Sequence, residues 1–281
     1  MKEGDEILQT HCLNCNAVAQ GDYCYDCGQR LRDNSDRSLS QLAGEFLGNI
    51  FFLDNRFFLS MWYLLRYPGR MTAEFLEGKR KKFISPVTLF LFFNLIYFFA
   101  SPLTDFSIAF KDQVFHQPYS GEWTLDWARL KLQNLGLDET AYSSIFQNTS
   151  DTISKSVMII NIPVLAIFVF LMAFKKRRFY YDSLIYSFHF FALFLASWIM
   201  ITPAMTVASI LAGSNSPIAS EIAYQLFAFG IPTIYAILSM KKFLNIKWYW
   251  AIPTGLFVML GWLMSNLLYR LIIFILTMLA T

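Results

Sequence analysis

The stretch SPVTLFLFFNLIYFFAS, residues 85–101, is uncharged and strongly apolar. Four further apolar segments follow it, near residues 156–174, 184–211, 222–240 and from 248 toward 279. A helix of about 20 apolar residues is long enough to cross the ~30 Å hydrocarbon core of a bilayer. The pattern therefore predicts a mainly α protein, a polytopic membrane helical bundle of about five transmembrane helices.

The composition agrees with lipid surroundings. Of the 281 residues, 56% are hydrophobic, 18% are aromatic and 15% are charged, whereas a soluble domain carries about 25% charged residues. The first 40 residues hold seven acidic and four basic side chains. They are too polar for a signal peptide, which predicts a cytoplasmic N-terminus.

All the cysteines lie near the N-terminus, as two Cys-x-x-Cys hooks formed by Cys12 with Cys15 and by Cys24 with Cys27. This spacing is typical of a structural zinc site, in which four thiolates surround one Zn²⁺. A reducing cytoplasm favours metal over disulfides. Four sulfur ligands leave no open position for catalysis, so the expected role of Zn²⁺ is to fold a small zinc ribbon.

Lysine and arginine residues gather before the first, third and fifth apolar segments. The clusters are Arg66, Arg70 and Lys79–Lys82, then Lys175–Arg178, then Lys241, Lys242 and Lys247. Basic loops of membrane proteins stay in the cytoplasm. The three clusters fall on one side of the membrane if the N-terminus is inside, and the C-terminus is then expected outside.

These signals divide the chain into three parts. Residues 1–37 are expected to form a cytoplasmic zinc ribbon and tether, and residues 38–84 cytoplasmic juxtamembrane amphipathic or interfacial helices. Residues 85–281 are expected to form the five-span transmembrane domain, with an outside helical loop at 103–155. The apolar run of residues 57–65 is too short to span and apolar enough to lie in the interface.

Several short motifs occur in a fixed order in the first third of the chain. They are Cys27-Gly28-Gln29, Leu53–Phe57, Leu64–Gly69, Glu77-Gly78-Lys79-Arg80 and Pro86. Together they resemble an uncharacterised bacterial inner-membrane family, a domain of unknown function that opens with a double-CxxC zinc ribbon and continues with several membrane helices. The resemblance covers about residues 11–100. It implies an architecture and a bacterial cytoplasmic membrane, and it implies no activity.

Five basic residues form a candidate contact for an anionic lipid headgroup or a phosphate: Arg70, Lys79, Arg80, Lys81 and Lys82. The favoured, plainer interpretation is that this cluster only sets the membrane topology. The segment is not a P-loop, because it lacks the upstream glycine and the trailing Ser or Thr.

Four polar residues within the apolar segments form a candidate intramembrane site: Asn94, Asn161, His189 and Arg270. The asparagines also suit hydrogen bonds between helices. For His189, a neutral imidazole bonded to a carbonyl is favoured over a proton relay. Arg270 can either snorkel to the outer interface or face the bundle interior, and residues 248–281 are too long for one ordinary span and too short for two.

The favoured function is a non-catalytic inner-membrane scaffold or adaptor whose zinc ribbon and interfacial helix dock a partner. The alternative is a channel, transporter or lipid-handling protein with a site between helices kinked by proline. A coupled transporter or a membrane enzyme is disfavoured because acidic residues such as Asp182 fall only at the ends of spans. Expected partners are membrane lipids and either a protein or a second copy of the chain. The acidic ribbon disfavours nucleic acid.

Overall fold

The computed structural model describes residues 10–19, 22–29, 31, 55–100, 109–177, 179–212 and 229–281. Within these ranges the chain is mostly helical. Its only sheet there pairs two short antiparallel strands, β1 (Thr10–His11) and β2 (Val18–Ala19). The predicted mainly α class, with a cysteine cluster at the N-terminus, is therefore confirmed.

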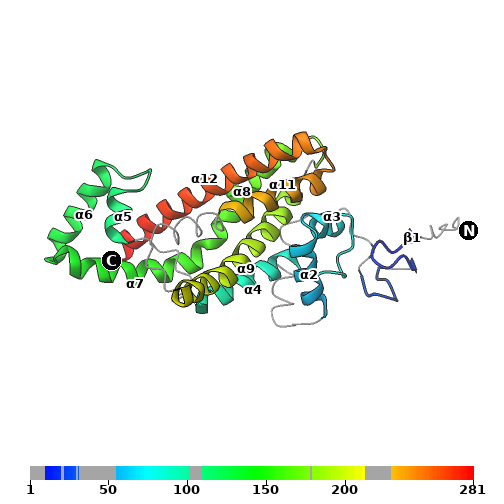
Figure 1. Ribbon diagram of the computed structural model, residues 1–281, viewed down its shortest axis with the longest axis horizontal. Helices are drawn as coiled ribbons and strands as arrows, with labels where there is room; N and C mark the ends of the chain where they lie inside the picture. Colours follow the sequence, from blue (N-terminus) through cyan, green and yellow to red (C-terminus); the bar gives the residue numbers. More distant parts are fainter. Residues whose placement is uncertain are drawn as a thin grey trace, which may run out of the picture.

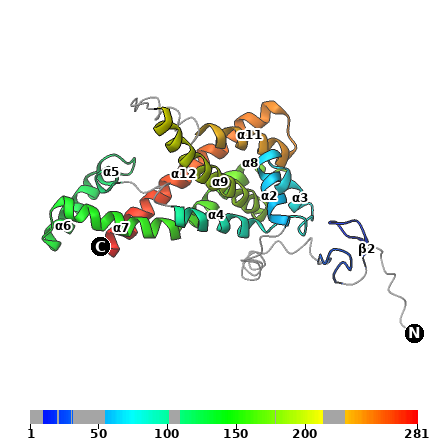
Figure 2. The same cartoon turned by 60° about the horizontal axis from the view of Figure 1, so that its bottom comes forward.

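The helices of the described chain follow in this order: α2 (Asn55–Arg66), α3 (Arg70–Leu76), α4 (Pro86–Ala100), α5 (Phe110–Phe115), α6 (Glu122–Leu135), α7 (Glu139–Val157), the 3₁₀ turn η2 (Met158–Ile160), α8 (Asn161–Ala173), α9 (Tyr180–Ala212), α11 (Ile231–Leu244) and α12 (Trp248–Ala280). The main bundle has α9 packed on α4 and α8, and α12 packed on α8 and α11. The helices α2 and α3 and the ribbon lie at one end of this elongated body, and α5, α6 and the C-terminus lie at the other (Figure 1). A second view shows the same separation (Figure 2).

Three helical stretches are long and apolar enough to cross a membrane: Glu139–Ala173, Tyr180–Ile201 and Trp248–Ala280. The first expected span corresponds to α4, which is apolar but shorter. Residues 222–228 of the expected fourth span lie outside the described chain, and α11 contains its remainder. The count of five spans stays a prediction.

The second expected span belongs to a longer helical stretch than the hydropathy indicated. The helix α7 passes through η2 directly into α8, so no loop separates the segment expected outside from the apolar run that begins near residue 156. The buried face of α7 is narrow and is formed by Tyr142, Phe146, Ser150 and Ser154. The rest of the helix surface can therefore carry polar side chains, which lowers the hydropathy of this segment. Helical periodicity therefore extends well beyond the apolar window.

Residues 248–280 form one continuous helix, α12, of 33 residues. At 1.5 Å per residue it is about 50 Å long, which exceeds the ~30 Å of hydrocarbon. Its second half packs against α7. Phe274 and Met278 of this half join a small separate core with Phe110 of α5 and Ala128 of α6, so the excess length holds the end of the molecule that is remote from the ribbon.

Tight helix contacts set the other end of the bundle. A Cβ on Gly255 of α12 would lie 2.6 Å from Ile237 Cα of α11, so this glycine allows the two backbones to approach closely. The helix α2 buries Phe57 and Leu64 and leaves Phe58 and Trp62 exposed. A helix with apolar side chains on both faces suits the boundary between bundle and lipid headgroups. The part of the expected interfacial segment before residue 55 lies outside the described chain.

Candidate metal centre and the basic cavity beside it

The two cysteine hooks have the same backbone geometry. In the first, Asn16 N–H donates to Cys12 O at 2.8 Å, and in the second Gly28 N–H donates to Cys24 O at 2.8 Å. The residue after each second cysteine has a positive φ, 66° for Asn16 and 68° for Gly28. Glycine and asparagine tolerate this conformation best. This role of Asn16 was not predicted from the sequence.

These turns bring the four cysteine sulfurs together. The Sγ atoms all lie within 4.8 Å of one another, and Cys12 and Cys24 are buried. The Sγ atoms of Cys12 and Cys27 are 3.6 Å apart, and those of Cys15 and Cys24 are 3.5 Å apart. Sulfurs at about 2.3 Å from one tetrahedral ion are about 3.8 Å apart, so the arrangement fits a bound metal ion.

At Cys24 the local backbone favours the thiolate form that a metal requires, whereas burial raises the pKa of the Cys27 thiol. The backbone N–H groups of Cys27 and Asp26 hydrogen-bond the Cys24 sulfur and lower the pKa of this thiol to about 7. Thiolates, not thiols, are metal ligands. The cluster of Cys12, Cys15, Cys24 and Cys27 can therefore bind a metal ion.

The ribbon is attached to the loop between α3 and α4 through two amide side chains. Gln29 is buried, its Nε2 donates to Gly78 O at 2.7 Å, and Lys81 N–H donates to its Oε1 at 3.4 Å. Lys82 N–H donates to Asn14 Oδ1 at 3.1 Å. Asn14 lies within the first hook and Gln29 follows the second. Both hooks thus contribute to one contact with the body of the protein.

This contact explains why two separate motifs occur together in the sequence. Cys27-Gly28-Gln29 and Glu77-Gly78-Lys79-Arg80 are joined by the hydrogen bond from Gln29 to Gly78. A buried amide that keeps both its donor and its acceptor occupied is stabilising, whereas one with neither costs a few kcal/mol. This pairing could not be predicted from local sequence patterns, because Gln29 and Gly78 are 49 residues apart.

A buried carboxylate, Glu74 of α3, lies under the same loop. Its Oε2 accepts from Lys82 Nζ at 2.6 Å and its Oε1 accepts from Arg70 Nε at 2.7 Å. Burial opposes ionisation of Glu74, but the hydrogen bonds from Lys82 and Arg70 outweigh this effect and lower the pKa of the carboxyl. Lys82 Nζ also donates to Tyr63 Oη at 3.0 Å. Lys82 is therefore engaged within the fold.

The expected basic headgroup site is divided by the structure. Lys82 pairs internally, and Arg80 lies over the ring of Phe75, 6.0 Å from its centroid. Lys81 is exposed. Arg70 instead faces a cavity that is also lined by Lys241 and Lys242 of α11. The proximity of these residues depends on the fold.

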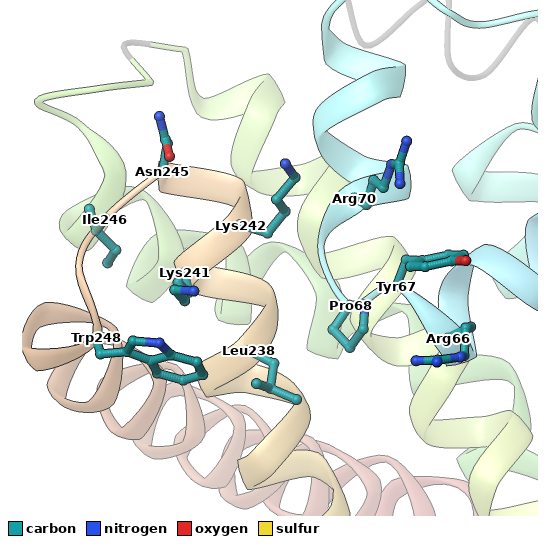
Figure 3. A pocket seen from close by; sticks show the side chains of 10 residues that line it. All are labelled: Arg66, Tyr67, Pro68, Arg70, Leu238, Lys241, Lys242, Asn245, Ile246 and Trp248. Atoms are coloured by element: carbon teal, nitrogen blue, oxygen red, sulfur yellow. The ribbon is translucent and has the colours of Figure 1, made fainter.

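This cavity has a volume of about 470 Å³ and lies between the α2–α3 turn and the α11–α12 turn. Its lining residues are Arg66, Tyr67, Pro68, Arg70, Leu238, Lys241, Lys242, Asn245, Ile246 and Trp248. Figure 3 shows that the two arginines come from one wall and the two lysines from the other. From the sequence, Arg66, Lys241 and Lys242 were expected only to set the membrane topology. Their spacing in the chain carries no sign of a shared site.

The remaining basic cluster lies at this end too. Lys176 Nζ donates to the carbonyls of Leu244 and Asn245 at 2.8 and 3.0 Å, and Arg177 Nη2 donates to Phe243 O at 3.3 Å. These bonds satisfy carbonyls at the end of α11, where a helix dipole favours cations. All three basic clusters therefore meet at the ribbon end of the molecule.

The candidate intramembrane residues do not converge on one point. His189 Nδ1 lies 2.9 Å from Thr72 Oγ1 of α3, close to the ribbon end. Arg270 Nη1 donates to Gln117 Oε1 at 3.4 Å, in the connection between α5 and α6 at the opposite end (Figure 1). Arg270 thus reaches toward the end helices. The partner of His189 is a hydroxyl rather than the carbonyl that was expected.

The two asparagines are differently placed. Asn161 is buried, and its Nδ2 donates to Met158 O at 3.2 Å within the same helical stretch. Asn94 is half-buried on α4. Among the described residues, no hydrogen-bond partner faces the Oδ1 atom of either side chain.

Asp182 lies at the end of a span, in the first turn of α9, as expected, and its side chain is buried there. The dipole of a helix favours a negative charge in this turn. The ribbon end of the bundle therefore contains two buried carboxyl groups, Asp182 and Glu74.

Comparison with known proteins gives one match. A family of proteins of unknown function (DUF3667) matches residues 54–98, which cover α2, α3, the basic loop and nearly all of α4. No curated protein and no solved structure matches the chain. The match agrees with the resemblance noted from the sequence. The matched residues do not extend to the ribbon or to the helices from α5 onward.

Proposed function

We propose that the protein is a non-catalytic membrane scaffold whose zinc ribbon binds a protein partner at the cytoplasmic face. The three apolar helical stretches and the four-cysteine cluster support this proposal. The surrounding membrane is proposed to be a bacterial cytoplasmic membrane. The basic end of the bundle, with the ribbon, then faces the cytoplasm, and the C-terminus faces outside.

Zinc is the proposed metal. A tetrahedral set of four thiolates is typical of structural zinc sites. The described part of the ribbon has two strands of two residues each and contributes no residue to the apolar core of the bundle. Metal binding would therefore supply the folding free energy of this part of the chain.

The exposed tyrosines of the ribbon carry the scaffold proposal. Tyr23 and Tyr25 are 61% and 79% exposed, and Leu13 is 47% exposed, while the ribbon is attached to the loop through Gln29. Tyrosine is enriched at the centre of protein interfaces because its ring is large, rigid and amphipathic. The partner is expected to present an apolar patch with basic residues around it, because the first 40 residues are acidic on balance.

Photo-crosslinking tests the proposal directly. A benzophenone amino acid at position 25 of the full chain, irradiated in cells, should give one discrete protein adduct, identified by mass spectrometry. The adduct should fall several-fold when Tyr23 is also changed to Ser, because the neighbouring aromatic contact is lost. The matched control carries the probe at Phe115, which is 53% exposed at the remote end.

Two results would contradict the proposed scaffold function. One is a position-25 probe that yields no protein adduct while the chain retains its metal. The other is an adduct pattern identical to that of the Phe115 control. An adduct with a second copy of the chain would identify self-association as the docking event.

A lipid-handling or transport role is the second candidate. The buried Oδ1 of Asn161 and Nε2 of His189 lack partners among the described residues, as expected for a polar site between helices. Co-purification of a defined solute that is lost in Asn161→Leu, with the fold intact, would favour this role. The separation of His189 from Arg270 argues against one continuous path through both residues.

A further inference from the structure

We infer that the cavity between the α2–α3 turn and the α11–α12 turn binds a phosphate group. This site goes beyond the proposed docking function and does not depend on it. Two arginines and two lysines line the cavity: Arg66, Arg70, Lys241 and Lys242. No acidic side chain is among the described residues that line it.

Charge balance is the first reason. Within the described chain, Arg66, Lys241 and Lys242 form no ion pair, and only Arg70 has a carboxylate partner, Glu74. Cations held around one cavity repel one another unless an anion enters. A phosphate offers several acceptor oxygens, and arginine can bind two of them at once.

The surroundings keep these cations available. The carbonyls at the end of α11 accept from Lys176 and Arg177, so they do not require Lys241 or Lys242. Lys241 Nζ lies 4.3 Å from the centroid of the Trp248 ring. A cation–aromatic contact of this kind leaves N–H groups free to bind an anion. The α12 helix begins beside the cavity, and its positive dipole end favours an anion there.

The walls of the cavity are held by a close backbone contact. Gly69 has φ 75° and ends the α2–α3 turn, and a Cβ there would lie 2.3 Å from Ser239 O of α11. The turn can therefore lie directly on α11. Glu74 fixes the guanidinium of Arg70 through the 2.7 Å hydrogen bond to Nε, which leaves the two terminal nitrogens for a ligand.

The aromatic residues beside the cavity favour a position at the headgroup level of a bilayer. Trp248, Tyr249 and Trp250 are all exposed at the start of α12, immediately before its apolar stretch. Exposed Trp and Tyr residues at a helix end mark the headgroup level of a bilayer. The volume of about 470 Å³ is within the range of small-molecule sites. A phospholipid headgroup and a soluble phosphate compound share the required chemistry.

Two binding measurements on the purified full chain test the inference. In the first, native mass spectrometry follows the binding of phosphatidylglycerol, with phosphatidylcholine of the same acyl chains as reference. In the second, calorimetry follows the binding of glycerol phosphate in detergent without added lipid. The test variant is Arg66→Gln/Lys242→Gln, which removes one cation from each wall.

The double variant should weaken binding by roughly 30-fold, since each basic residue near an anionic headgroup contributes about fivefold. Loss of phosphatidylglycerol affinity alone would identify a lipid headgroup as the ligand. Loss of glycerol phosphate affinity would identify a soluble phosphate compound. The single variant Lys242→Gln, with an expected loss of about fivefold, serves if the double variant is unstable.

The matched control is Lys79→Gln/Lys81→Gln, which removes two cations from the neighbouring loop outside the cavity. It should retain its affinity within a few-fold. The inference is overturned if the cavity variants bind both ligands as the unchanged protein does. It is also overturned if the control loses as much affinity, because a diffuse basic surface would then explain the binding.

Discussion

The substitution Gly69→Ala gives the sharpest test of how α2 and α3 are attached to the bundle. Gly69 precedes α3 with φ 75°, and the backbone of Ser239 lies directly against it. The added Cβ would lie 2.3 Å from Ser239 O and 2.8 Å from Ser239 Cα. Both neighbours are backbone atoms of a buried helix, so no flexible side chain can move aside.

Two costs add at this position. A residue with a Cβ in the left-handed region costs roughly 1–2 kcal/mol. Relief of the overlap requires the turn to move from α11 by about 1 Å, and overpacking of this kind costs typically 1–3 kcal/mol. The free energy of unfolding should therefore fall by about 2–5 kcal/mol. The affinity of the cavity for a phosphate group should fall as well, because the two walls separate.

Gly136→Ala is the matched control. Gly136 ends α6 with φ 62°, and no heavy atom of the described residues lies within 4 Å of an added Cβ. Only the backbone cost of roughly 1–2 kcal/mol applies there. Equilibrium unfolding of both variants in mixed micelles, followed by circular dichroism, separates the overlap from the backbone cost. Equal destabilisation by the two variants would refute the contact of the turn with α11.

Three further outcomes follow from the contacts described above. Cys24→Ser/Cys27→Ser should abolish metal binding, measured as zinc per chain, and leave the helical content of the bundle unchanged; retention of one zinc per chain would contradict the cysteine site. Lowering the pH through the pKa of Glu74 should destabilise the protein, because a lowered folded-state pKa gives stability that is present above the unfolded pKa and lost on protonation. Glu74→Gln should reduce the free energy of unfolding at neutral pH by about 1–3 kcal/mol, seen as a lower thermal midpoint, and should make stability depend less on acid pH. A stability–pH profile that is the same in this variant and the unchanged protein would exclude the pair of Glu74 with Lys82. Phe274→Ala should cost about 3–5 kcal/mol and make α5 and α6 sensitive to protease, because the fully buried ring lies within the small remote core; equal protease resistance would contradict that packing.

The candidate metal centre was readable from the sequence because its ligands are local. Two hooks within 16 residues place four sulfurs together by short turns, and the residue types specify the chemistry. The mainly α class could be predicted for a similar reason, since a long apolar run such as residues 85–101 indicates a helix buried in lipid or in the protein core. The role of Asn16 was missed, although an asparagine after the second cysteine is a usable signal for a left-handed residue.

Helix ends were less predictable, because packing rather than hydropathy sets them. A helical segment before the apolar run near residue 156 was expected, and α7, which buries one narrow face among polar residues, continues into that run without a break. The length of α12 looked anomalous for a single span until its second half was found packed against α7. Tertiary contacts stabilise helical segments whose ends cannot be predicted from hydropathy alone.

The sequence by itself determined the four-cysteine cluster, the apolar helices and the presence of three basic clusters, because each depends on residues that are neighbours in the chain. Only the tertiary structure decided which basic residues share a cavity, and that Gln29 attaches the ribbon to Gly78. Arg66 and Lys242 are 176 positions apart in the sequence. Their proximity depends on the close contact of Gly69 with Ser239, which no local pattern encodes.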